Sequence, residues 1–111
     1  MRQGLIDAVK RTTEEELTAA NKAWRQFAST HEGYAVILEE AQEAEVELQK
    51  VARQIAIIWE MTKQNAPHEE IKAAADILEQ TAQNMAAEAI QTAAMARKML
   101  DYLESVKGFK E

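Results

Sequence analysis

Residues 34–65 read YAVILEEAQEAEVELQKVARQIAIIWEMTKQN, a stretch without proline or glycine. Its apolar side chains recur at alternating spacings of four and three, the pattern of a helix that packs against other helices. They are Ile37, Ala41, Ala44, Leu48, Val51, Ile55 and Ile58. We therefore predict a helix over 34–65, about 45 Å long. Because this is long for a small domain, we expect it either to bend between Lys50 and Gln54 or to pack its far end against a second chain.

A further long helix is predicted over residues 68–106. Pro67 ends the preceding helix, because proline disfavours helical geometry at the residue before it, and proline suits the first turn of the next helix. So short a connection requires the two helices to pack antiparallel. The apolar stripe of the second is rich in alanine, so neighbouring helices can approach closely; it comprises Ile71, Ala75, Leu78, Ala82, Met85, Ala89, Thr92, Ala96, Met99, Leu103 and Val106.

The N-terminal third is expected to contain two shorter pieces. Residues 1–11 suggest a short helix or arm. Thr12 or Thr13 followed by three glutamates resembles a capping box, which predicts a new helix over 13–28. Gly33 then breaks the chain before the long helix. At the other end, residues 107–111 are expected to be a frayed tail.

Composition narrows the class of protein. The 111 residues suit a single domain, and the formal charge of −6 argues against a protein that binds a nucleic-acid backbone. There is no cysteine, which excludes disulfides and fits a cytoplasmic protein. No segment looks like a signal peptide or membrane span. The sequence thus predicts an all-α antiparallel helical bundle, completed by oligomerisation, most simply as a homodimer with a four-helix core.

Acidic residues lie beside the predicted seam. Glu40 and Glu43 stand one turn apart on the same helix face, next to Glu39. Such stacking of like charges is tolerable if solvent screens it or if a divalent cation neutralises it. On the last helix, Glu88 and Gln91 form a similar pair near an apolar stripe, where a carboxylate is costly unless it is paired or binds a metal. Two such pairs on facing helices would supply the oxygen ligands that Mg²⁺ prefers and leave room for a polyphosphate.

The pattern Glu39-Glu40-x-x-Glu43 followed by Glu88-x-x-Gln91 resembles the MazG-like branch of the all-α NTP pyrophosphohydrolases, whose motifs are EExxE and ExxD. The strings HEGYAVILEE (31–40) and EAIQTAAMA (88–96) are similar to small MazG-like proteins, often encoded by phages or prophages. The likeness covers about residues 24–48 and 85–104. It implies Mg²⁺-dependent hydrolysis of a nucleoside triphosphate to the monophosphate and pyrophosphate, with Mn²⁺ as a substitute metal.

The same resemblance implies roles for individual residues. Glu40, Glu43, Glu88 and Gln91 match the metal-binding positions, and Glu39 would orient or deprotonate the attacking water. Gln91 stands where the family has aspartate; its amide oxygen can still bind Mg²⁺, but one negative charge is lost.

Further residues have two interpretations each. Lys98 shares a helix face with Gln91 and would meet a phosphate, or is an ordinary surface lysine. Tyr102 and Trp24 would stack on a base, although a tryptophan at helical spacing is more often core. Glu88 alone would also suit an ion pair with Arg53 or Lys50. The alternative to an enzyme is a helical interaction module in which the site has decayed, as the Gln91 substitution allows.

Overall fold

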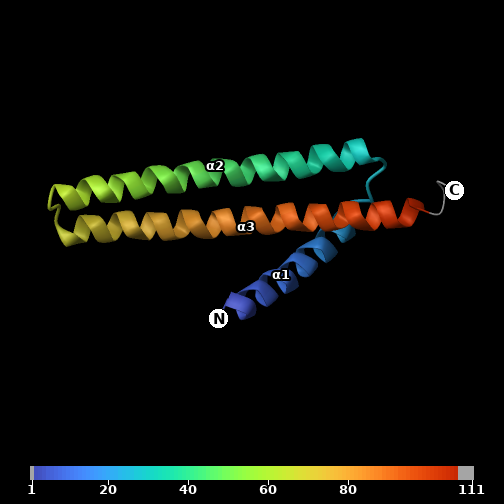
Figure 1. Ribbon diagram of the computed structural model, residues 1–111, viewed down its shortest axis with the longest axis horizontal. Helices are drawn as coiled ribbons and strands as arrows, with labels where there is room; N and C mark the ends of the chain where they lie inside the picture. Colours follow the sequence, from blue (N-terminus) through green and yellow to red (C-terminus); the bar gives the residue numbers. More distant parts are fainter. Residues whose placement is uncertain (1, 108–111) are drawn as a thin grey trace.

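The computed structural model describes residues 2–107, which form three α-helices and no strand. They are α1 (Arg2–Ala23), α2 (Thr30–Lys63) and α3 (His68–Val106). Helices α2 and α3 lie antiparallel as a long hairpin, and α1 crosses α3 near its C-terminal half (Figure 1). The all-α class and the bounds of the last helix are confirmed. Within the described residues, no helix combines the length and hydropathy that crossing a bilayer requires.

The N-terminal helix differs from the prediction of two pieces. The hydroxyls of Thr12 and Thr13 donate to the carbonyls of Ala8 and Val9, four residues back, instead of capping a new helix. Threonine makes this bond inside a helix without interrupting it. Helix α1 therefore runs unbroken through residue 12 and ends at Ala23, five residues before the predicted end. The predicted tail falls largely on residues 108–111, which lie outside the described part.

Helix α2 begins earlier than predicted because Ser29 caps it. The Ser29 hydroxyl accepts a hydrogen bond from the Glu32 backbone N–H at 3.1 Å. Gly33 lies inside this helix and does not break it; a Cβ there would collide with the end of the Met99 side chain and touch the Phe27 ring. The glycine thus permits close approach between α2 and its neighbours.

The connection to α3 begins where α2 ends, at Lys63, two residues before the predicted end. Asn65 adopts a left-handed conformation with φ of 53°, which asparagine tolerates better than most residues, and Pro67 follows. The chain thereby reverses direction within a few residues. The helix itself is continuous through Lys50–Gln54, where a bend was one of the two expectations.

The residues of α2 that face α3 differ in part from the predicted seam. The half-buried row runs at 4-3 spacing and comprises Glu40, Ala44, Glu47, Val51, Gln54, Ile58 and Met61. Leu48 and Ile55, both predicted to pack inside, are about half exposed. On α3 the matching row is Ile71, Ala74, Leu78, Thr81, Met85, Glu88, Thr92, Met95, Met99 and Tyr102. Helix α1 covers only part of the hairpin, so fully buried side chains are few; Phe27, Thr81, Ala94 and Lys98 all lie below a tenth exposed.

Candidate functional site

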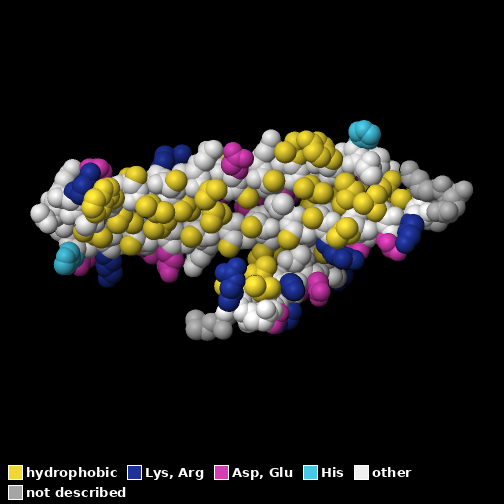
Figure 2. All heavy atoms as spheres, viewed as in Figure 1, with side chains coloured by type: hydrophobic (Ala, Val, Ile, Leu, Met, Phe, Trp, Pro, Cys, Tyr) yellow, Lys and Arg dark blue, Asp and Glu magenta, His cyan; other side chains and the backbone are white. Residues whose placement is uncertain are grey.

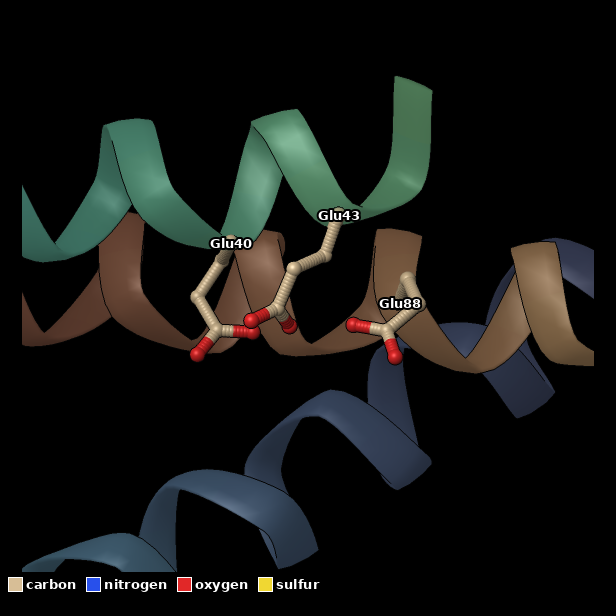
Figure 3. A group of neighbouring side chains, drawn as sticks. All are labelled: Glu40, Glu43 and Glu88. Carbon is tan, nitrogen blue, oxygen red and sulfur yellow. The ribbon is translucent and has the colours of Figure 1, made fainter. Parts of the chain in front are cut away.

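Three predicted acidic residues meet where α2 faces α3. Glu40 and Glu43 project from successive turns of α2, and Glu88 reaches them from α3. One carboxylate oxygen of each lies within 4.8 Å of the others, and Figure 3 shows the three carboxylates gathered between the helices on the side where α1 lies. The antiparallel hairpin thus brings together residues 45 or more positions apart. The prediction that these acids converge agrees with the structure.

The cluster concentrates negative charge in partly buried surroundings. Burial raises the pKa of Glu40 above its ordinary value, and the charges of Glu43 and Glu88 raise it further. Burial likewise raises the pKa of Glu88, and so does its contact with Glu43. Both shifts mean that the ionised cluster is unfavourable without a compensating positive charge. Lys50 does not supply one, because its ammonium pairs with Glu47 at 3.2 Å.

Gln91 lies against the same carboxylates. With its amide nitrogen turned toward them, it donates to Glu40 Oε2 at 3.1 Å and to Glu88 Oε2 at 3.2 Å. This orientation is assigned from the hydrogen-bond pattern, since amide oxygen and nitrogen are interchangeable in shape. The amide is therefore part of the cluster, as predicted. In this orientation it stabilises the two carboxylates as a hydrogen-bond donor, and it would turn to offer its oxygen to a cation.

A cavity of about 840 Å³ opens beside the cluster, between α1 and the α2–α3 hairpin. Glu39, Glu40 and Gln91 line it from the hairpin. From α1 come Glu16 and three alanines, and Trp24, which is 75% exposed, lies at the connection. Trp24 is thus a cavity-lining residue and not core. The volume is within the range of about 300–1,000 Å³ typical of small-molecule sites.

Lys98 lines the same cavity and is almost wholly buried, at 3% exposure. Its Nζ lies 5.1 Å from the centre of the Phe27 ring, a cation–π contact. Within residues 2–107 it forms no ion pair or side-chain hydrogen bond. The charge of Lys98 also contributes to lowering the pKa of Glu32 on the same cavity wall, but Glu32 forms its ion pair with Arg25. A buried ammonium without an ion pair of its own is unusual, because burial of a charge normally requires a counter-charge. The interpretation of Lys98 as an ordinary surface lysine is therefore wrong.

The connection between α1 and α2 is held by an ion pair that the sequence reasoning missed. The two terminal guanidinium nitrogens of Arg25 donate to the Glu32 carboxylate at 2.8 Å each, and Glu32 also accepts from the Ala28 backbone N–H at 3.0 Å. The hydrogen bond from Arg25 lowers the pKa of Glu32, and the Ala28 N–H lowers it further. The spacing Ser29-x-x-Glu32 is that of a capping box. This spacing could have indicated from the sequence that Glu32 folds back toward the connection. The pair fixes one wall of the cavity.

Other predicted residues lie elsewhere. Tyr102 is half-buried on α3 and is not part of the cavity lining. Glu16 was not predicted as a site residue, because the sequence does not indicate how α1 docks.

In comparisons with known proteins, no family model, curated protein or solved structure matches this chain.

Proposed function

We propose that this chain is a Mg²⁺-dependent nucleoside triphosphate pyrophosphohydrolase of MazG-like type. One observation carries the proposal: three carboxylates from two facing helices adjoin a cavity that also contains a buried lysine. Acids suit a divalent cation, and an unpaired ammonium suits an anion. A nucleoside triphosphate complexed with Mg²⁺ carries both charges in one molecule.

The donor set fits Mg²⁺ or Mn²⁺. Hard divalent cations of this kind take carboxylate and amide oxygens, and Mg²⁺ usually binds through a few protein carboxylates together with substrate phosphates. Glu40, Glu43 and Glu88 would hold the ion, with Gln91 as a neutral fourth ligand. When bound, the cation would polarise phosphoryl oxygens and offset the charge of the leaving pyrophosphate. The raised pKa values of Glu40 and Glu88 support this, since a cation would offset both causes of the shifts, the burial of the carboxylates and their mutual repulsion.

The cavity residues take the remaining roles. Lys98 would bind a phosphate of the triphosphate chain, and the exposed Trp24 ring would stack on the base. Glu39, on the cavity wall, would accept a proton from water as the water oxygen attacks the α-phosphorus. The bond between that phosphorus and the bridging oxygen breaks, so the products are the monophosphate and pyrophosphate. Tyr102 has no role in this proposal, because it does not line the cavity.

Incubation of purified protein with each ribonucleoside and deoxyribonucleoside triphosphate in the presence of Mg²⁺ tests the proposal. We expect equimolar monophosphate and pyrophosphate from at least one substrate, and loss of this activity in Glu40→Gln. Glu45→Gln is the matched control, because Glu45 is an exposed glutamate of the same helix outside the cluster. Absence of pyrophosphate from every substrate at high protein concentration would contradict the catalytic proposal.

Gln91 supports a second candidate, a non-catalytic interaction module of the same fold. Its amide bridges Glu40 and Glu88 and so occupies the space between them without a cation. Calorimetry with Mn²⁺ and a non-hydrolysable triphosphate analogue separates the two candidates. Tight binding that disappears in Glu43→Gln favours the enzyme, whereas no binding favours the module.

A further inference from the structure

One charged residue of α1 faces the carboxylate cluster across the cavity. Glu16 lines the cavity from α1, opposite Glu39 and Glu40 of α2, and the other α1 residues of the lining are alanines. Glu16 is half-buried, whereas its neighbours Glu14 and Glu15 are exposed. Figure 3 shows the carboxylates of the cluster directed toward the side on which the α1 ribbon passes. Helix α1 therefore brings a further acid to the acidic end of the cavity.

The position of Glu16 is electrostatically unfavourable in the metal-free chain. Burial is the main cause of the raised pKa of Glu40, and the charge of Glu16 is among those that raise it further. Within residues 2–107, Glu16 has no ion pair. Like charges that face one another across a partly buried space repel. Docking of α1 in this position thus has a cost that a cation between Glu16 and the cluster would remove.

Helix α1 is held by little apolar packing. It packs against α3, and among its described residues none is buried. Figure 2 shows α1 projecting from the hairpin, with charged side chains of both signs over its visible surface. Because helices in proteins owe most of their stability to packing, a helix docked in this way opens more easily than the hairpin. A cation bound at the cavity can therefore shift the docking of α1 measurably.

The same cavity contains a second group that indicates a charged ligand. Lys98 lines it at 3% exposure and, in the part of the chain that the structure describes, has no ion pair of its own. A buried ammonium that borders a cavity suits an anionic ligand, as the acids at the other end suit a cation. Helix α1 forms one wall of this cavity, so its docking shapes the site for both charges.

We propose that Glu16 binds the cation of the carboxylate cluster through a cation-bound water, and that the cation thereby closes α1 over the cavity. This inference rests on the proposed metal site. Glu16 is not among the three acids whose oxygens lie within 4.8 Å of one another, and Mg²⁺ usually keeps several waters through which a more distant carboxylate contributes. Because Gln91 is neutral, the hairpin supplies three negative charges, and Glu16 adds a fourth. The cation then completes the cavity wall before the nucleotide binds.

Glu16→Gln tests the proposal, and Glu15→Gln is the matched control, because Glu15 is its exposed neighbour on the same helix. Calorimetry with Mn²⁺ alone should show about tenfold weaker binding to Glu16→Gln than to the wild type, since outer partners of a metal site contribute about 10–100-fold to its affinity. Glu15→Gln should bind Mn²⁺ as the wild type does. Equal affinities of Glu16→Gln and the wild type would overturn the proposal.

Hydrogen exchange of the α1 amides, measured by mass spectrometry, reports the docking of the helix. Because the coupling between two binding equilibria is reciprocal, saturating Mn²⁺ should slow exchange in α1 by the same factor of about ten in the wild type and in Glu15→Gln. In Glu16→Gln, Mn²⁺ should leave this exchange unchanged. Without Mn²⁺, α1 of Glu16→Gln should exchange about two- to fivefold more slowly than that of the wild type, because one repulsion is removed. A glutamate with a merely structural role would not show this reversal.

The outcomes separate this inference from the proposed function. Mn²⁺ binding that is lost in Glu43→Gln but leaves the exchange of α1 unchanged in the wild type would overturn the inference and keep the metal site. Absence of Mn²⁺ binding to the wild type would overturn both.

Discussion

Replacing Glu88 by glutamine removes one of the three charges in the carboxylate cluster and keeps the size of the side chain. Oxygens of the three acids lie within 4.8 Å of one another. Two unit charges about 4 Å apart interact by about 1 kcal/mol in water and about 4 kcal/mol at an effective dielectric constant of 20. Because Glu43 is exposed and Glu88 is half-buried, the interaction energy between their charges lies toward the lower of these two values. We expect the metal-free variant to be about 1–2 kcal/mol more stable than the wild type at pH 7.

The pH dependence follows from the raised pKa values of Glu40 and Glu88. A carboxyl whose pKa is raised on folding binds its proton more tightly in the folded state, so its ionisation costs stability as the pH rises. The wild type should lose stability from the ordinary carboxyl pKa of about 4.3 upward. The advantage of Glu88→Gln should be full above the raised values and absent below about pH 4.

Thermal unfolding by circular dichroism measures both effects. For a chain of this length, 1 kcal/mol corresponds to roughly 4 °C, so the variant should melt about 4–8 °C higher at pH 7 without metal. Mn²⁺ should raise the melting temperature of the wild type and leave that of the variant unchanged. Glu45→Gln, an exposed glutamate outside the cluster, is the control and should behave as the wild type. A variant less stable than the wild type at pH 7, or an advantage that persists at pH 4, would refute the reasoning.

Further expected outcomes concern the helix contacts and the cavity. Gly33→Ala should lower stability by no more than about 1 kcal/mol, because the added methyl group must displace the flexible end of Met99 while alanine favours the helix, as thermal unfolding will show. Gly4→Ala has open space around it and should instead raise stability by up to about 1 kcal/mol in the same assay. Lys98→Met keeps the side chain's length and removes its charge; calorimetry should show about tenfold weaker binding of a triphosphate analogue, with no loss of stability. Chelation of the metal with EDTA should lower the melting temperature of the wild type and have no effect on Glu43→Gln.

The sequence predicted the all-α class, the antiparallel hairpin and α3, because long uninterrupted periodic segments around Pro67 leave few alternatives. It misassigned the packing register of α2. Helix α2 carries apolar residues both on its inward row and one position further round, and periodicity alone does not separate the two. The structure places Gln54 on the inward row and Ile55 outside it. The sequence of α2 alone could not show which of the two rows faces inward, because that depends on how α3 packs against α2.

The candidate site was predictable where it rests on helix spacing. Glu40 and Glu43 lie one turn apart on α2, as Glu88 and Gln91 do on α3, and the antiparallel hairpin brings the two pairs together. The burial of Lys98 was not predictable, because it depends on the connection that carries Phe27 and on α1, whose docking leaves no periodic signal. The predicted break within the N-terminal helix is wrong, and the error had a local cause: Thr12 or Thr13 was interpreted as a cap, yet both hydroxyls bond back into their own helix.

The division of the site between the hairpin and α1 has a consequence for folding kinetics. The carboxylate cluster needs only α2 and α3, which are consecutive in the chain and meet through a tight turn. The cavity also needs α1, which contacts α3 although the whole of α2 separates the two helices in sequence. Contacts between segments close in sequence form faster than those that close long loops. We therefore expect refolding chains to acquire the cluster before the cavity, so that a folding intermediate binds Mn²⁺ before it can bind a nucleotide.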